Sequence, residues 1–292
     1  MYYIVYGFFW LLSLLPLRVL YILSDCIYGF VFYIKKYRRG VVMSNLKIAF
    51  PEKTEKERLK IAKQFYHNMI DTFIETIKMV SASQKFIQKH FTGNWEVINN
   101  LKPTGRKVQV HIGHNFNWEW GNAAAAKRME LPYVGAYMPL KNKTFNRFFY
   151  NLRSKHGTLL VSATNMREDM LPHHNTQYMI GLATDQNPGH PASALWFNFF
   201  GRPTPFISKT AKSAIDYKCA VVFGFIHKKK RGYYNVVFTL VEENAANTNE
   251  VELTRKFVRY MEGVIRQYPE MWLWSHRRWK HQWKEEYGPV RE

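Results

Sequence analysis

The sequence predicts an α/β fold in which a mixed central sheet is covered by helices, behind an apolar helical segment at the N-terminus. From residue 106 onward, short apolar runs alternate with amphipathic stretches of about ten to fifteen residues, a pattern typical of strands connected by covering helices. The 292 residues suffice for a large core, and no Pro-, Gly- or Ser-rich linker divides them. We therefore expect an N-terminal anchor over residues 1–34 and a single α/β domain over residues 35–292.

The N-terminal segment is apolar enough to meet a membrane. Residues 2–17 carry no charge, and as a helix they would reach about 24 Å, short of the roughly 30 Å hydrocarbon core. Continuing to Ile34 gives sufficient length but includes two charges and a proline. Two interpretations stay open: one tilted spanning helix with Arg18 snorkelling, or a broken helix lying in the interface. The basic cluster 35–39 predicts that the following domain faces the cytoplasm. A buried apolar hairpin of a soluble protein is the third, less favoured interpretation.

The net charge predicts anionic partners. Lys and Arg number 42 against 22 Asp and Glu, which gives +20, all of it within residues 35–292. Lipid headgroups, lipid phosphates and an acidic carrier protein all fit such a surface. Nucleic acid is an alternative that the apolar N-terminus disfavours. Cys26 and Cys219 cannot form a disulfide framework. The pair His111 and His114 lacks a third ligand at a metal-binding spacing, so we expect neither metal nor cofactor.

The elements of the body follow from periodicity. Residues 54–80 predict a long amphipathic helix that opens with the capping-box pair Thr54 and Glu57. Strands are expected at 107–112, 132–138, 158–162, 177–184, 194–200, 219–227 and 233–241. Helices are expected at 117–129, 142–155, 164–171, 207–217 and 250–267. The basic turn 228–232 joins two apolar strands and predicts a hairpin.

One segment carries candidate chemistry. A strand that ends near Ile112 runs into a loop with His114, and then into an alanine-rich helix that opens near Glu119. On one continuous helix the two side chains would be rotated by about 140°, but a loop followed by a first helical turn lets them meet. An imidazole oriented by a carboxylate takes protons from alcohols near neutral pH. No Ser or Cys stands in a nucleophile elbow, which favours direct proton abstraction from substrate over an acyl-enzyme.

Several blocks in order resemble the bacterial lipid A late acyltransferases, the lauroyl and myristoyl transferases. The first is the His-x4-Glu block of residues 114–119. The others are Leu15-Pro16-Leu17-Arg18, Asn45 to Pro51, Asp185-Gln186-Asn187, Phe199 to Pro203 and Trp272 to Lys280. Together they cover nearly the whole chain.

The resemblance implies a glycerolipid acyltransferase-like fold and transfer of a fatty acyl chain from acyl carrier protein to a hydroxyl of a lipid A precursor, in lipopolysaccharide biosynthesis at the inner membrane. It implies that His114 is the general base, that Glu119 orients it, and that Asp185 is a further catalytic residue. The implied substrate-binding residues are Arg167, Asn117, Gln186, Arg202, Arg277 and Arg278.

The sequence also departs from the family. Many members have Gly where this chain has Phe116, which affects acceptor geometry or chain selectivity. The Pro-Glu-Gly-Thr/Ser block of the glycerophosphate acyltransferases is absent, which argues against glycerol 3-phosphate as acceptor. An aminolipid, a lysophospholipid or a glycolipid acceptor stays an alternative. So does a non-enzymatic, membrane-tethered basic binding module.

Overall fold

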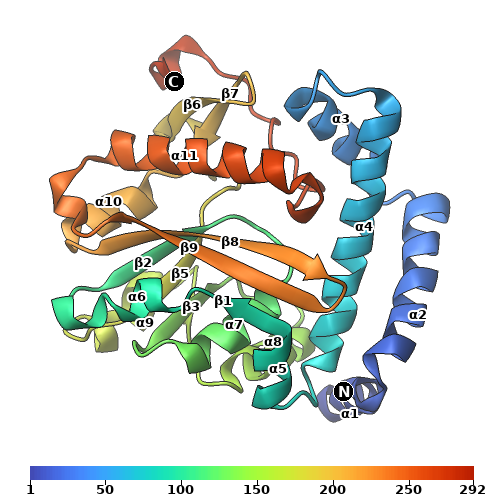
Figure 1. Cartoon of the computed structure of the whole chain (residues 1–292). Coiled ribbons are helices and arrows are strands. Elements are labelled where there is room, and N and C mark those ends of the chain that lie inside the picture. The colour runs from blue at the N-terminus through green and yellow to red at the C-terminus, as the bar shows by residue number, and fades with distance from the viewer.

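A computed structural model describes residues 1–292 and contains two sheets (Figure 1). The central sheet has seven strands in the order β1-β9-β8-β2-β5-β3-β4. Their bounds are β1 Phe91–Gly93, β2 Val108–Ile112, β3 Tyr133–Tyr137, β4 Leu159–Ser162, β5 Met179–Ala183, β8 Ala220–Lys230 and β9 Tyr233–Glu242. Strands β8 and β9 pair antiparallel as a hairpin, and every other neighbouring pair in this sheet is parallel. The predicted mixed sheet is therefore confirmed.

Helices cover both faces of this sheet. In Figure 1, α11 (Glu250–Gln267) and α10 (Lys209–Asp216) lie on one side, and α5 (Gln84–His90), α7 (Trp118–Arg128) and α8 (Lys143–Ser154) lie on the other. Two short helices, α6 (Glu96–Asn99) and α9 (Met166–Asp169), complete the body. Every strand and helix predicted between residues 106 and 267 is present, although α9 is much shorter than expected.

A small second sheet was not predicted. Strand β6 (Leu195–Phe199) lies outside the central sheet, between β10 (Val290–Arg291) and β7 (Arg202–Phe206). Sequence patterns do not favour β7 as a strand because it contains Pro203 and Pro205. At the edge of a sheet a proline is tolerated, since it removes no ladder hydrogen bond there.

The predicted long helix is α4 (Glu55–Lys78), which runs along one end of the body in Figure 1. Its capping box is formed: the Glu57 carboxylate accepts from the Thr54 amide at 2.8 Å, and the Thr54 hydroxyl accepts from the Glu57 amide at 3.3 Å. One face of α4 packs on the body and another packs on the N-terminal helices. This helix therefore connects the N-terminal segment to the α/β body.

The N-terminal segment is a broken helix. Helix α1 (Tyr2–Leu14) ends before Pro16, and α2 (Leu17–Gly29) continues through the π-helical turn Phe30–Ile34. Proline opens α2 because its ring and missing N–H are tolerated at a helix start and not in an interior. The stretch Leu17–Ile34 is long and apolar enough to cross a membrane by length and composition. Helix α3 (Arg39–Ala49) follows the basic cluster.

Helix α2 lies beside α4 (Figure 1), and the hydroxyls of Tyr21 and Ser24 donate to α4. Ser24 donates to Asp71 of α4 at 2.7 Å, whereas Val19 and Ile22 are exposed. The main hydrophobic core includes Leu20 and Phe32 from this segment together with residues of the body. Contacts thus cross residue 34, and the predicted division into an anchor and a domain stays a prediction.

Candidate active site

The edge of the central sheet brings two loops together. Strands β2 and β5 are parallel neighbours, and Ile112 at the end of β2 is paired with Ala183 at the end of β5. Loops that follow the carboxyl ends of adjacent parallel strands leave from the same edge, where α/β proteins build their sites. His114 lies two residues beyond Ile112, and Asp185 lies two residues beyond Ala183. The register of the sheet therefore places these side chains against each other.

His114 and Asp185 form a hydrogen-bonded pair. Nδ1 of His114 lies 2.6 Å from Oδ1 of Asp185, and the His114 amide donates to Oδ2 at 2.9 Å. Trp272 Nε1 also donates to Oδ2, at 2.6 Å. Asp185 is buried, while the side chain of His114 is 28 % exposed. Because Oδ1 of Asp185 accepts a hydrogen bond from Nδ1, a neutral His114 carries its proton on Nδ1. Nε2 then keeps a lone pair that can accept a proton from substrate.

The contact between His114 and Asp185 shifts the pKa of both residues. Burial by itself lowers the pKa of His114, but the charge and hydrogen bond of Asp185 outweigh it, so the pKa is raised above its usual value. Burial by itself raises the pKa of Asp185, but its ion pair with His114, the two bonds from that residue and the bond from Trp272 together lower this pKa well below the usual range. The carboxylate stays charged at neutral pH and stabilises an imidazolium on His114.

Glu119 does not contact His114, which corrects the prediction from the His-x4-Glu spacing. It lies in the first turn of α7, as expected, but its carboxylate is held by Arg153 of α8. Arg153 Nη2 donates to Oε1 at 2.6 Å and Arg153 Nε donates to Oε2 at 3.0 Å. The physical reason is the β2–β5 register, which gives Nδ1 of His114 to Asp185 and leaves Glu119 to face α8.

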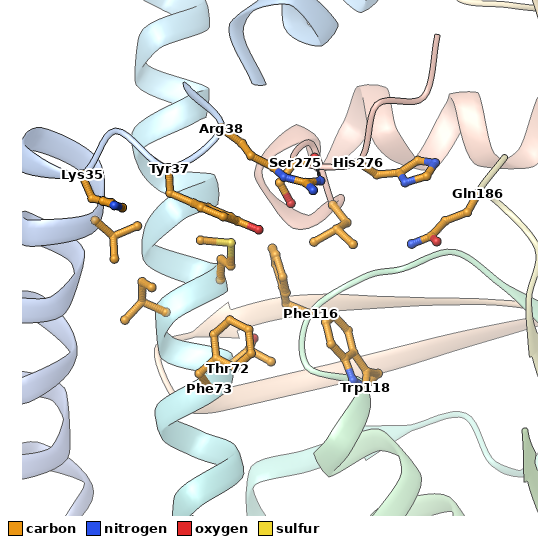
Figure 2. A pocket seen from close by; sticks show the side chains of 14 residues that line it. Lys35, Tyr37, Arg38, Thr72, Phe73, Phe116, Trp118, Gln186, Ser275 and His276 are labelled. Atoms are coloured by element: carbon orange, nitrogen blue, oxygen red, sulfur yellow. Dashed lines mark hydrogen bonds between the residues drawn. The ribbon is translucent and has the colours of Figure 1, made fainter. Parts of the chain in front are cut away.

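Figure 2 shows a cavity of about 540 Å³ that is lined by neighbours of the pair and not by the pair itself. One lining residue is Trp118, whose ring centroid lies 6.4 Å from that of His114. Phe116 and Trp118, on either side of the start of α7, line the cavity together with Gln186, which directly follows Asp185. The other walls come from α4, from the chain after α2 and from the segment after α11: Val31, Lys35, Tyr37, Arg38, Met69, Ile70, Thr72, Phe73, Leu273, Ser275 and His276. More than half of the lining is apolar, with basic side chains on the N-terminal side. Such a site suits an acyl chain with a polar or anionic head.

The model of the bacterial lipid A biosynthesis acyltransferase family matches residues 1–281. The chain belongs to this family. It is 23% identical over 278 residues to the lipid A biosynthesis palmitoleoyltransferase of Escherichia coli (strain K12). The aligned region covers 94% of this chain and 89% of the relative. The lipid A biosynthesis acyltransferase of Shigella flexneri matches to the same extent. The lipid A biosynthesis lauroyltransferase of Escherichia coli (strain K12) is 22% identical over 279 residues, again 94% and 89% of the two chains.

Family membership makes this protein an acyltransferase of lipid A biosynthesis, and the resemblance based on motifs is confirmed. Two predicted substrate-binding residues lie next to the pair in this family member. Gln186 lines the cavity. Asn117 is fully buried and caps α7, where its Oδ1 accepts from the Trp120 amide at 3.2 Å. Its Nδ2 donates to Glu75 at 2.7 Å, so its side chain holds protein groups.

The predicted arginines of this acyltransferase fall in different places. Arg278 is fully buried: its guanidinium donates to Asn187 Oδ1 and to the Pro205 carbonyl, both at 2.9 Å. This corrects the expectation that Arg278 contacts substrate, because its side chain is fully buried and both of its Nη atoms fasten the loop after β5 to β7. Arg277, Arg202 and Arg167 are exposed, the last two on β7 and α9. Their predicted contacts with substrate stay predictions.

Two residues of the site have partners that the sequence does not reveal. Arg153 lies in an amphipathic helix among other basic residues, and nothing in the spacing distinguishes it as the partner of Glu119. Trp272 opens the block 272–280, which resembles the family, but its bond to Asp185 spans 87 positions of the chain. Asp185, in contrast, could be found from its position just after a strand.

Proposed function

We propose that this protein transfers a fatty acyl chain from acyl carrier protein to a hydroxyl of a lipid A precursor, with His114 as the general base. The observation that supports it most directly is the His114–Asp185 pair beside a largely apolar cavity. A base needs one nitrogen fixed and a lone pair on the other, and the bond at Nδ1 leaves Nε2 as the nitrogen that can accept a proton.

In the proposed reaction, Nε2 of His114 takes the proton of the acceptor hydroxyl as its oxygen attacks the thioester carbonyl. The resulting tetrahedral intermediate collapses by breaking the carbon–sulfur bond. The leaving thiolate of the carrier arm takes the proton from the imidazolium, which restores neutral His114. Asp185 stabilises the imidazolium between these steps and itself stays ionised, as the aspartate of a Ser-His-Asp triad does.

The charges favour anionic substrates. The body carries the whole net charge of +20, and both a lipid A precursor and an acyl carrier protein are anionic. Lys35 and Arg38 lie at the cavity and come from the cluster that follows the apolar segment. Basic groups at this depth suit lipid phosphates.

We place the enzyme at the inner membrane with its catalytic domain facing the cytoplasm. The exposed apolar side chains of α1 and α2 include Phe8, Leu11 and Ile22, and the basic cluster 35–39 follows them directly. Apolar side chains next to Lys and Arg are typical of a segment at the cytoplasmic surface of a membrane.

The test is acyl transfer by detergent-solubilised protein. Purified enzyme is incubated with acyl carrier protein thioesters of increasing chain length and a tetra-acylated lipid A precursor, and the product is followed by mass spectrometry. We expect a mass gain of one acyl chain, absent in His114→Ala. His174→Ala, which changes an exposed histidine on the surface, is the matched control and retains activity. Full transfer by His114→Ala would overturn the assigned base.

A different acceptor is the second candidate, and Phe116 favours it. Its ring lines the cavity where many family members have a glycine, so the space for the acceptor differs. An aminolipid, a lysophospholipid and a glycolipid are therefore offered in competition with the lipid A precursor. Donor hydrolysis without transfer to the precursor, again lost in His114→Ala, would identify the wrong acceptor. Binding of anionic lipid with no change in any donor would favour the non-enzymatic module.

A further inference from the structure

We propose that Tyr21 of α2, acting through Glu75 of α4, is a positioning residue for the loop that carries His114. Helix α2 then has two functions on two faces: its outer face meets lipid, and its inner face holds the catalytic loop. The kinetic part of this inference rests on the proposed function. Its structural part, the ordering of residues 113–121, does not.

Glu75 is the centre of the proposed chain of contacts. Its side chain is fully buried, and three neutral donors from three elements converge on the carboxyl. Tyr21 Oη donates to Oε1, while Asn117 Nδ2 and Tyr234 Oη of β9 donate to Oε2, each at 2.7 Å. The backbone carbonyl of Glu75 also accepts from Trp120 Nε1 at 2.8 Å. A buried carboxyl with such a full set of bonds fixes the groups around it.

Asn117 transmits the position of Glu75 to the loop. Its Nδ2 is bound by Glu75, and its Oδ1 caps the first turn of α7. The loop is held at two further points: the His114 amide donates to Asp185, and the Phe116 amide donates to the Met271 carbonyl at 3.3 Å. Glu75 is thus the support at the end of the loop where α7 begins. Losing it frees that end while His114 keeps its bond to Asp185.

Tyr21 is held firmly enough to act as a support. The guanidinium of Arg231 lies over its ring, 4.3 Å from the centroid. Arg231 is itself bound to Asp71 at 2.7 Å and to Asp25 at 2.6 Å. Gly232, with φ of +75°, brings the tip of the β8–β9 hairpin against the Tyr21 hydroxyl, where a Cβ has no room. The tip of the β8–β9 hairpin therefore packs on Tyr21 and holds its hydroxyl against Glu75 of α4.

The structure offers a matched control on the same helix. Ser24, one turn after Tyr21, is buried and also donates to α4, to Asp71 at 2.7 Å. Ser24→Ala and Tyr21→Phe each remove one hydroxyl that donates across the α2–α4 contact at 2.7 Å. Only the Tyr21 hydroxyl belongs to the chain of contacts that leads through Glu75 to Asn117. A loss common to both variants would report weaker docking of α2, and a loss confined to Tyr21→Phe reports positioning.

The experiment compares wild type, Tyr21→Phe, Glu75→Gln and Ser24→Ala in detergent micelles, where attachment to a membrane is not required. We expect Tyr21→Phe and Glu75→Gln to lower kcat by roughly tenfold or more, the scale at which misplacement of reacting groups is felt, with KM changed less than twofold. We expect the double variant to lose no more than the worse single one, because both changes break one chain of contacts. Ser24→Ala is expected to keep the wild-type kcat.

Hydrogen–deuterium exchange gives a readout that does not depend on turnover. Backbone amides of residues 113–121 are expected to exchange faster in Tyr21→Phe and Glu75→Gln, and at the wild-type rate in Ser24→Ala. Unchanged exchange and kcat in Tyr21→Phe, or equal losses in Ser24→Ala, would overturn the inference. If His114→Ala keeps full turnover, the proposed function fails, and the exchange data still decide the role of Tyr21.

Discussion

Two buried carboxyl groups bind the two ends of the loop 113–117, and their pKa values are shifted in opposite directions. Asp185 is bound by the imidazole of His114, and its pKa is lowered. Glu75 is bound only by neutral donors. Burial, reinforced by the charge of Asp71, outweighs the bonds from Tyr21, Tyr234 and Asn117 and raises the pKa of Glu75 to about 7. Equal burial thus gives opposite results because only one carboxyl has a partner that can carry positive charge.

The difference assigns different work to the two groups. Asp185 is charged throughout the neutral range and acts on the protonation of His114. Glu75 can hold a proton near neutral pH. A carboxyl that stabilises a positive charge in the reaction, as Asp185 does, would lose that ability once it was protonated. Glu75 therefore serves as a scaffold for the loop, in agreement with its donors, which come from α2, β9 and the cap of α7.

The largest expected effect comes from removing the charge of Asp185. Asp185→Asn keeps the size of the side chain but removes the charge that stabilises imidazolium, so we expect kcat to fall roughly 10³-fold or more. The pKa of His114 is raised by Asp185, so without that charge burial dominates and this pKa falls. The acid limb of kcat/KM, measured from pH 5 to 9, is then expected to move to lower pH. An unchanged limb would mean that Asp185 does not act through His114.

A smaller effect is expected at Glu75, in the pH dependence of the free energy of unfolding. The folded pKa of Glu75 is about 7, above that of an exposed glutamate, so the folded state binds the extra proton. The stability linked to Glu75 is complete at low pH and is lost as pH rises through 7, by about 3 kcal/mol for a shift of this size. Glu75→Gln cannot titrate. We therefore expect the stability of Glu75→Gln relative to wild type to improve between pH 5 and pH 8, as measured by thermal unfolding in one detergent.

A constant difference between the two proteins over that pH range would contradict the raised pKa of Glu75. Ser24→Ala is again the matched control, because it removes a buried bond of α2 to Asp71 and no bond to Glu75. Its stability relative to wild type is expected to stay constant with pH.

The same contrast explains what could be predicted from the sequence. Six of the seven strands of the central sheet follow from short apolar runs between helical stretches, whereas β1, with three residues, was not predicted. Asp185 follows from its position after one of the predicted strands. Its pairing with His114 requires the β2–β5 register, which no local pattern contains. The His-x4-Glu spacing favoured Glu119 instead because a nearby residue is visible in a sequence and a distant one is not. Arg153, 34 residues from Glu119, decided that pairing.

Glu75 was invisible for a different reason. In the sequence it is one of several carboxylates on an amphipathic helix, where a solvated face is the default interpretation. Only the packing of α2, β9 and α7 around α4 buries it. Similarly, the basic turn 228–232 predicts a hairpin but no partner for Arg231, which the fold binds to Asp25 and Asp71. Contacts between segments far apart in the chain determine both outcomes.

The smallest expected effect tests the part of the loop that contacts neither carboxyl. Phe116 lies between His114 and Asn117, and its ring packs 5.8 Å from that of Phe65 and 5.9 Å from that of Trp118 at the cavity wall. Phe116→Leu keeps an apolar wall but removes the ring, at a cost in stability of about 1 kcal/mol. We expect the ratio of kcat/KM between neighbouring acyl chain lengths to change several-fold, the scale of one methylene in an apolar pocket. The acid limb of the pH profile is expected to stay in place, because the His114–Asp185 bond is untouched. If the limb moves with the chain preference, the loop is one unit, and the separate roles assigned to its two ends are wrong.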